Sequence, residues 1–359
     1  MPPVKKIAII GTQGVPARYG GFETLVENLL ENRSAETEYT VFCSSRDIER
    51  KSNSYKGGRL RYVPLHANGI QSIPYDIWSM LKAVRGYDTW LVLGVSGCMI
   101  LPLLKPFCRS RIVVNIDGLE HRREKWGRFA RWFLRKSEAA AVKYADVIIA
   151  DNKGIQDYVS ERYGKHSVLI GYGGDHVLKQ MSEEEQTAIL ERLGLEKGNY
   201  AIAVCRIEPE NNCRMILDAF STSDKRLIFI GNWERSDYGR KLKEEYGKYP
   251  NIIMHSPVYD TEILYALRNN AAVYVHGHSA GGTNPSLVEA MFFGRPVLAY
   301  DVVYNRATTD NKASYFKDAS QLSALLSERQ APDCGTALNE IARSEYIWKH
   351  IAELYENTY

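Results

Sequence analysis

The sequence predicts an α/β protein made of two doubly wound, Rossmann-like domains that face a cleft. Short β-branched runs alternate with segments of helical periodicity along nearly all of the 359 residues. That alternation is typical of parallel sheets covered by helices on both faces. It pauses once, at the glycine-rich segment IGYGGD of residues 170–175, and then restarts. A chain of this length also suits two domains of ordinary size.

The first domain is expected at residues 1–170. A strand at residues 5–10 leads into the glycine-rich loop GTQGVPARYGG, after which residues 22–30 have helical periodicity. Further strands are expected at residues 39–43, 60–63, 89–93, 112–115 and 147–150, and a long helix at residues 123–144. The most apolar stretch, residues 90–104, is shorter than the roughly 20 residues that span a bilayer. It is therefore predicted to be a core strand followed by a packed helix.

The second domain is expected at residues 171–335. Strands are predicted at residues 200–205, 227–230, 251–255 and 272–275, and helices at residues 212–220, 238–246, 261–268 and 286–293. The amphipathic tail, residues 336–359, is expected to form a helix that packs back on the first domain. Because ligands of such sheets bind at the carboxyl ends of the strands, the two domains predict a cleft between them.

Composition excludes several classes of protein. A net charge of +3 is too small for a nucleic-acid-binding protein. The six cysteines include no C-x-x-C pair and are expected to be reduced thiols of a cytoplasmic protein. The N-terminus enters a strand without a secretory pattern. Neither a D-x-D pair nor a cluster with metal-ligand spacing occurs, so no metal or cofactor is indicated.

The segment HGHSAGGTNPSLVEAM, residues 276–291, is predicted to run from a strand through a polar loop into a helix. Gly281 and Gly282 let the backbone approach an anion, and the helix N-terminus adds positive N–H groups. Glu289 lies one turn into the helix and could reach hydroxyls of a nucleotide or a sugar. The alternative is an ordinary strand-to-helix turn with a solvated glutamate.

The loop GTQGVPARYGG does not fit the dinucleotide pattern G-x-G-x-x-G, because its second glycine is Gly14 and Pro16 interrupts the helix start. Hydride transfer is therefore disfavoured. Its glycines and Arg18 suit close approach of a substrate, although a long surface turn would have a similar composition.

Arg206 directly follows a predicted strand, and EPENN leads from it into a helix. A guanidinium at that edge offers two parallel hydrogen bonds to diphosphate oxygens. The alternative is a surface arginine paired with Glu208.

Asp117 and Glu120 in NIDGLEHRREKW follow another strand. Either carboxylate could accept a proton or hold a sugar hydroxyl, but Asp-Gly is also common in turns. His121 could act as a base or be a solvated residue beside two arginines.

Residues 122–136 contain seven Lys or Arg against one Glu, with four aromatic residues between them. That mixture suits an anionic membrane surface or a lipid-phosphate substrate. The alternative is an amphipathic core helix with a basic solvated face.

These motifs together resemble the GT-B glycosyltransferases of family four. The strand followed by RIEPENN, and later HGHSAGGTNPSLVEAM, resemble the donor-binding half of that family. IIGTQGVPARYGGFETLVENLL, NIDGLEHRREKW and YADVIIADNKGI resemble the N-terminal domain of its bacterial rhamnosyltransferase branch. The resemblance covers nearly the whole chain.

The resemblance implies metal-independent transfer of a sugar, with retention, from a nucleoside diphosphate to a saccharide. The expected donor is dTDP-L-rhamnose, and the expected acceptor is a lipid-linked saccharide at the cytoplasmic face of the membrane. Asp117, Arg206 and Glu289 are the implied catalytic residues. The implied donor site comprises Gly14, Arg206, Asn211, Asn212, Gly281, Gly282, Thr283, Asn284, Ser286 and Glu289. The implied acceptor site comprises Arg18, Tyr19, Gly20, Gly21, Glu120 and His121.

Three positions depart from the family pattern. Gly281 replaces a glutamate that contacts the transferred sugar, Asn211 replaces a lysine that faces the diphosphate, and Asp117 replaces a histidine. Two other functions therefore stay open, a nucleotide-sugar epimerase and a non-catalytic protein that binds nucleotide sugars.

Overall fold

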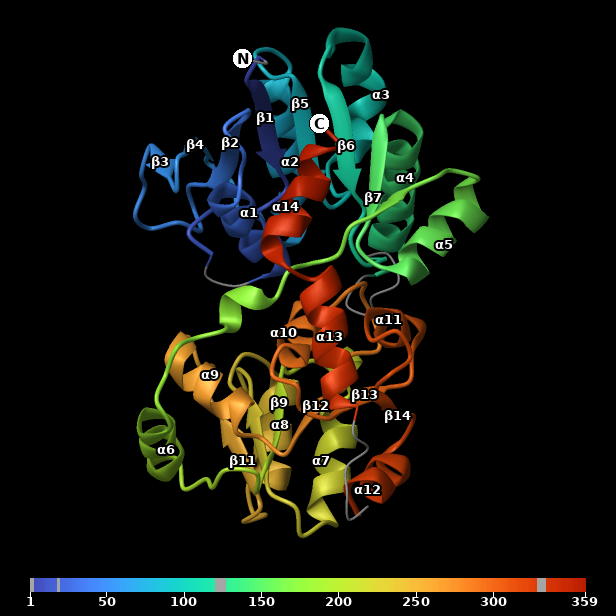
Figure 1. Ribbon diagram of the computed structural model, residues 1–359. Helices are drawn as coiled ribbons and strands as arrows, with labels where there is room; N and C mark the ends of the chain where they lie inside the picture. Colours follow the sequence, from blue (N-terminus) through green and yellow to red (C-terminus); the bar gives the residue numbers. More distant parts are fainter. Residues whose placement is uncertain (1–2, 18–19, 120–126, 328–333) are drawn as a thin grey trace. The chain divides into compact units, whose positions relative to one another are not determined.

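The computed structural model describes residues 3–17, 20–119, 127–327 and 334–359 (Figure 1). The chain forms two compact units. Unit 1 is Met1–Tyr172 with Trp348–Tyr359, and unit 2 is Gly173–Ile347. Each unit contains a mainly parallel sheet with helices in the connections, which confirms the predicted α/β class with two Rossmann-like domains. The chain passes from unit 1 to unit 2 within the glycine-rich segment 170–175.

The sheet of unit 1 has eight strands in the order β3-β4-β2-β1-β5-β6-β7-β8. All neighbours are parallel except β3 and β4. The strands are β1 Lys5–Ile10, β2 Thr37–Ser44, β3 Ser54–Tyr55, β4 Gly58–Val63, β5 Thr89–Leu93, β6 Arg111–Asn115, β7 Val147–Ala150 and β8 Val168–Leu169. The central strand β5, TWLVL, is buried along its whole length, as expected where helices cover both faces.

The helices of unit 1 are α1 Gly21–Glu31, α2 Ser72–Ala83, α3 Leu101–Leu104, α4 Arg128–Tyr144, α5 Lys153–Tyr163 and α14 Trp348–Glu356. Short 3-10 turns are η1 Gly69–Gln71, η2 Cys98–Ile100 and η3 Lys105–Phe107. The packed helix expected after β5 is therefore only the four-residue α3, set between η2 and η3. Pro102 and Pro106 stand at the starts of α3 and η3, and a proline inside a longer helix would remove a backbone hydrogen bond.

The sheet of unit 2 has six parallel strands in the order β11-β10-β9-β12-β13-β14. They are β9 Ala201–Val204, β10 Leu227–Ile230, β11 Ile252–His255, β12 Val273–His276, β13 Val297–Tyr300 and β14 Ser314–Phe316. The helices are α6 Glu183–Arg192, α7 Cys213–Ser221, α8 Asp237–Tyr246, α9 Thr261–Asn269, α10 Pro285–Met291, α11 Val303–Thr308, α12 Ala319–Ser327 and α13 Gly335–Glu345. The 3-10 turns are η5 Asp175–Val177 and η6 Pro209–Asn211.

Apolar clusters cover both faces of the sheet of unit 2. Ile202 belongs to one cluster, whereas its neighbours Ala201 and Ala203 belong to the other. Since successive side chains of a strand point to opposite faces, the two clusters lie on the two sides of β9.

The tail forms two helices instead of the single one that was expected. α13 buries Leu338 and Ala342 in a core of unit 2, whereas α14 buries Trp348 and Tyr355 in the core of unit 1. In Figure 1, α14 is the red helix drawn near α1 and β6, and the hydroxyl of Tyr355 accepts a hydrogen bond from Asn115 Nδ2 at 2.7 Å. Because the two apolar stripes belong to different cores, the helical pattern breaks between α13 and α14.

Among the described residues, no helix has both the length and the apolar character that crossing a bilayer requires.

Asp76 of α2 provides a test of how this core responds to pH. Burial raises its pKa to about 8, although the backbone N–H of Gly97 donates to it. The unfolded chain therefore loses this proton above about pH 4, while the folded chain keeps it to about pH 8. Stability is lost as pH rises through that window. We expect Asp76→Asn to remove this loss and to raise the free energy of unfolding at pH 7 by as much as ~4 kcal/mol.

Urea unfolding of both proteins at pH 4.5 and pH 7.5 measures the effect. The advantage of Asp76→Asn must grow between the two pH values; a constant difference would mean that Asp76 is ionised in the folded protein.

Candidate functional site

Two loops of unit 2 leave the sheet at the same edge. Residues 205–212 follow β9, and residues 277–284 follow β12. The two strands are parallel neighbours, with Val273 in register with Ala201. Their carboxyl ends therefore bring the Arg206 loop (205–212) and the glycine loop (277–284) together, at the edge where such sheets bind ligands.

Hydrogen bonds fasten these two loops to one another. Both the N–H and the hydroxyl of Ser279 donate to the carbonyl of Glu210, at 3.0 and 2.8 Å. Asn212 Nδ2 donates to the carbonyl of Gly277 at 2.8 Å. A Cβ atom at Gly277 would lie 2.3 Å from the carbonyl oxygen of Asn211, so only glycine permits this approach.

Arg206 presents its charge at the surface of its loop. Its side chain is 37% exposed, and its ion pair with Glu208 is long, at 3.8 Å. The structure therefore contains the ion pair with Glu208 that was predicted as the alternative. Such an exposed, long pair contributes little stability, so the guanidinium can exchange Glu208 for another anion at little cost.

Asn211 lies differently from what the family comparison implied. Its side chain is buried, and its Nδ2 donates to the carbonyl of Arg206 at 2.7 Å. The amide therefore holds the Arg206 loop from inside and does not extend toward a diphosphate. Asn212 adopts a left-handed conformation with φ 51°, which asparagine tolerates better than most residues. Its amide is engaged with Gly277.

In the glycine loop, Gly281 stands in open space. Among the described residues, the neighbourhood of Gly281 holds no atom within 4 Å of the position that a Cβ would take beyond its own chain neighbours, yet its φ of +118° strains any other residue. Asn284 caps α10 by accepting from the N–H and the hydroxyl of Ser286, at 3.1 and 2.8 Å. Thr283 is buried beside them. The side chains of Asn284 and Ser286 are thus hydrogen-bonded to one another.

Glu289 of α10 is held in an ionic cluster. Its side chain is 16% exposed, and its Oε2 lies 2.5 Å from Nη2 of Arg268. His176 Nε2 lies 3.5 Å from Oε1. Burial alone would raise the pKa of Glu289, but the charge of Arg268 and the contact with His176 outweigh it and hold the pKa at about 2. The alternative of a solvated glutamate is therefore wrong.

Two stacked histidines mark the end of β12. The rings of His276 and His278 are 4.4 Å apart at 14°. Burial lowers the pKa of His276 to about 3, so its ring is neutral. Within the described ranges, neither ring nitrogen of His276 has a hydrogen-bond partner. The stacking of these two rings could not be predicted from the sequence, because it depends on side-chain direction at the sheet edge.

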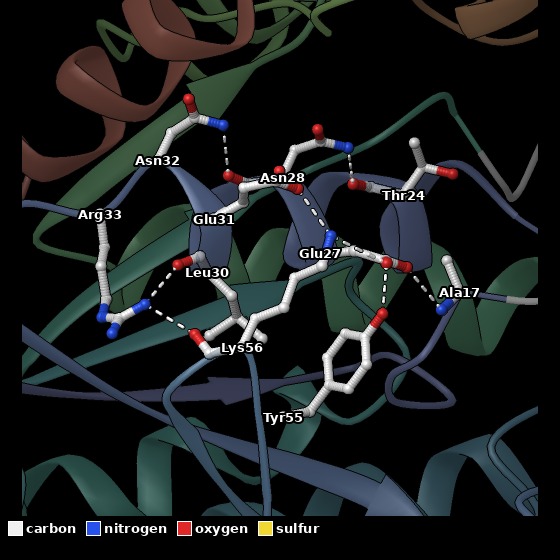
Figure 2. Close-up of polar contacts among 10 residues, drawn as sticks. All are labelled: Ala17, Thr24, Glu27, Asn28, Leu30, Glu31, Asn32, Arg33, Tyr55 and Lys56. Carbon is white, nitrogen blue, oxygen red and sulfur yellow. Dashed lines mark hydrogen bonds and ion pairs between the residues drawn. The ribbon is translucent and has the colours of Figure 1, made fainter. Parts of the chain in front are cut away.

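In unit 1, two glutamates one turn apart on α1 hold the loop that follows β1. Glu23 accepts from the hydroxyl of Thr12 at 2.9 Å and the N–H of Gln13 at 2.8 Å. Figure 2 shows Glu27 accepting from the N–H of Ala17, at 2.8 Å, and from the hydroxyl of Tyr55. Glu27 also pairs with Lys56 at 3.1 Å. The loop is thus fastened from its second residue to its seventh.

The glycines of that loop are required by packing. A Cβ at Gly11 would lie 2.0 Å from the carbonyl oxygen of Leu93, and one at Gly14 would lie 2.6 Å from Cys43 Sγ. The N–H of Gly14 donates to Thr12 Oγ1 at 3.2 Å. Gly14 was expected to contact the transferred sugar. The side of Gly14 that would carry a Cβ instead faces the core of unit 1.

Asp117 follows β6 in a left-handed conformation, with φ 60°. Its N–H donates to Asn115 Oδ1 at 3.0 Å. Left-handed conformations of residues other than glycine are uncommon and cluster at functional sites, so this geometry fits both a turn and a site residue. Burial raises the pKa of Tyr355, and the nearby charges of Asp151 and Asp117 add to that effect.

The predicted acceptor residues are only partly described. Gly20 is exposed with φ 128° and precedes α1, whose first residue is Gly21. Arg18, Tyr19, Glu120 and His121 lie outside the described residues.

The cysteines and the possible metal ligands were also located. All six cysteine thiols are free, and Cys213 Sγ lies 3.9 Å from Cys205 Sγ across the base of the Arg206 loop. In the part of the chain that the structure describes, no three His, Cys, Asp or Glu side chains form a group that could hold a metal ion.

Comparison with known proteins agrees with this division of the chain. Residues 4–175 match a family described as "Domain of unknown function (DUF1972)", and residues 185–324 match "Glycosyl transferases group 1". No curated protein sequence matches the chain. Residues 185–324 are therefore similar to the group 1 glycosyltransferases, and residues 4–175 are similar to the first family.

Solved structures confirm the GT-B fold. Sucrose-phosphate synthase of Thermosynechococcus elongatus superposes with a TM-score of 0.80 at 17% identity, covering 98% of both chains. HepE of Anabaena, solved with UDP, gives 0.76 at 14% identity over 99% of both chains. A glycosyltransferase of Rickettsia africae gives 0.73 at 11% identity over 99% of this chain and 98% of that one.

Gly281 provides a test of the glycine loop. We expect Gly281→Ala to destabilise the protein by at least about 1 kcal/mol, because the new side chain has room but the backbone conformation strains it. Chemical denaturation of the variant and the wild type measures the difference. Equal stability of the two would show that the loop relaxes freely.

Proposed function

We propose that this chain is a glycosyltransferase that moves a sugar from a nucleoside-diphosphate donor to a hydroxyl of a saccharide acceptor. One observation carries the proposal. The exposed guanidinium of Arg206 stands on a loop that is hydrogen-bonded to the glycine loop, inside the group 1 glycosyltransferase domain. HepE, a structural neighbour, has been solved with UDP and with UDP-glucose, which supports a nucleotide-sugar donor for this fold.

Arg206 is the residue that we assign to the departing diphosphate. Negative charge grows on that group as the bond to the sugar breaks, and a preorganised cation stabilises it more in the transition state than before it. The N–H groups of Gly282, Thr283 and Asn284 assist from the glycine loop. Asn211 supports the reaction indirectly. Its hydrogen bond to the Arg206 carbonyl fixes the backbone from which the arginine side chain extends.

Glu289 holds the nucleotide side of the donor. An ionised carboxylate has about four acceptor positions, and its two ionic partners leave room for hydroxyl groups of the ribose. The proposed donor is dTDP-L-rhamnose, and transfer proceeds with retention, without a metal, through an oxocarbenium-like transition state. Asp117 and Gly14 of unit 1 are assigned to the transferred sugar, and the residues around Arg18 and His121 to the acceptor.

A non-catalytic nucleotide-sugar-binding protein is the second candidate. It is favoured by Gly281, where the family pattern has a carboxylate and this chain has open space. A binder retains the donor without releasing nucleoside diphosphate, and an epimerase converts the donor without any acceptor. Product analysis with and without a saccharide acceptor separates all three functions.

The variant Arg206→Ala tests the proposal. We expect it to lower kcat/KM for sugar transfer by about 100-fold, equivalent to roughly 3 kcal/mol of transition-state stabilisation. Arg214→Ala is the control, because Arg214 is an exposed arginine of the same unit whose side chain donates to Glu245 and Tyr246. Transfer by Arg206→Ala at the rate of the control would refute the assignment.

Binding is measured first, by calorimetry with dTDP, UDP, GDP and their common sugar conjugates. Tight binding of one nucleoside diphosphate, and tighter binding of one conjugate, identifies the donor. If the protein bound none of them, the proposed function would be wrong, whatever the activities of the variants.

We also propose that α4 binds the anionic cytoplasmic face of a membrane, where a lipid-linked acceptor would be found. Its first turns carry two exposed aromatic residues, Phe129 at 77% and Trp132 at 48%, whose rings stack 5.9 Å apart. Arg128, Arg135 and Lys136 are exposed around them. Aromatic rings at the headgroup level with basic residues nearby suit peripheral binding.

Replacing Arg128, Arg135 and Lys136 by Gln tests this surface. At about 1 kcal/mol for each basic residue, affinity for vesicles with anionic lipids should fall by about 100-fold. The control replaces three basic residues of α8, Arg240, Lys241 and Lys243, by Gln and should bind vesicles normally. Unchanged binding of the α4 variant in a flotation assay would withdraw the membrane proposal.

A further inference from the structure

Both carboxylate oxygens of Glu289 meet a basic side chain from a different element. Arg268 in the last turn of α9 approaches Oε2 at 2.5 Å, and His176 of η5 approaches Oε1 at 3.5 Å. Two other segments, α9 and η5, therefore meet at one side chain of α10. None of the sequence motifs includes Arg268 or His176.

Arg268 is an unusual ion-pair partner because it is buried. The residue is only 3% exposed, and within the described ranges its Nε and Nη1 atoms have no hydrogen-bond partner. Removing a guanidinium and a carboxylate from water costs free energy that their attraction does not always return. Apolar residues of the same size would often stabilise the fold as well. The pair therefore calls for a role beyond stability.

The surroundings of the pair place it beside the candidate donor loops. The hydroxyl of Tyr274 on β12 lies 3.4 Å from the carbonyl oxygen of Val204, the last residue of β9. Burial raises the pKa of Tyr274, and the charge of Arg268 lowers it while that of Glu289 raises it, so both charged side chains lie near this tyrosine. The ionic cluster thus lies next to the strand end from which the Arg206 loop begins.

We propose that Arg268 and His176 are positioning residues that hold Glu289 fixed and ionised as the acceptor for hydroxyl groups of the bound donor. The proposal rests on the proposed function. The two basic side chains take one acceptor position on each oxygen and leave the others for a ligand. A fixed carboxylate also binds without the entropy loss that a free glutamate side chain would pay on ordering.

Loss of Arg268 should therefore introduce a pH dependence into donor binding. Burial raises the pKa of Glu289, and the charge of Arg268 is the largest effect that opposes it. In Arg268→Met the burial effect is opposed by His176 alone. Glu289 then takes up a proton as pH falls, and a protonated carboxyl accepts hydroxyl groups poorly. Tyr274 of β12 also interacts electrostatically with this carboxylate, and it stays neutral because burial raises its pKa.

The experiment is calorimetric titration from pH 6.0 to 8.5 with whichever of dTDP, UDP and GDP the wild type binds best. For the wild type we expect an affinity that changes little with pH. Arg268→Met should bind about 10-fold more weakly at pH 6.0 than at pH 8.5, the change expected for one group titrating within that range. Glu289→Gln should bind weakly at every pH.

Three further variants separate positioning from direct contact and from folding. Arg268→Met/Glu289→Gln removes both buried charges, and it should fold well and bind as Glu289→Gln does. If Arg268 touched the ligand through its unpartnered nitrogens, the double variant would bind more weakly than Glu289→Gln. Arg268→Lys keeps the charge and should largely restore the flat pH profile. His176→Gln leaves Arg268 beside Glu289 and should therefore keep a nearly flat profile.

The outcomes distinguish failure of the positioning role from failure of the proposed function. A wild type that binds no nucleoside diphosphate ends the proposed function. A wild type that binds, with Arg268→Met equally tight and equally flat with pH, overturns the positioning role alone. Should Arg268→Met fail to fold, the double variant and Arg268→Lys still decide between the two results.

Discussion

The candidate site of unit 2 depends on the hydrogen bonds that join the Arg206 loop to the glycine loop. Ser279 donates twice to the Glu210 carbonyl, and Asn212 donates to the Gly277 carbonyl. These bonds require that β9 and β12 be neighbours, which the strand order provides. They also require glycine at position 277, where any side chain would meet the backbone of Asn211. Because the loops are joined, the backbone of Arg206 is held in place while its guanidinium stays partly exposed.

Two arginines of this unit have opposite environments, and the difference assigns their roles. Arg206 is partly exposed and has a long pair with Glu208, so exchanging that partner for a ligand costs little. Arg268 is buried against Glu289, and separating them would leave two uncompensated charges in the interior. A mobile anion can therefore be bound by the first arginine, whereas the role proposed for the second is to act through the glutamate that it holds.

The sequence predicted the elements better than the side chains. Periodicity located β1, β5 and β7 to the residue, because buried parallel strands are short β-branched runs. It also placed Arg206 just after a strand end and Glu289 one turn into a helix. It could not show that Asn211 turns inward or that Arg268 reaches Glu289, since the direction of a side chain depends on tertiary packing. The tail was misjudged for a related reason: an amphipathic pattern shows that a face is buried, not in which core.

The glycines show how far a motif can support a function. Gly11 and Gly14 look like a ligand-binding loop in the sequence, but Leu93 and Cys43 lie so close that packing alone requires glycine there. Their presence therefore says little about a ligand. Gly281 is different, because no atom crowds it and only its backbone conformation excludes other residues. A loop that maintains an awkward conformation around open space gains no packing energy from it, so Gly281 is the glycine whose role is best sought in what the loop binds.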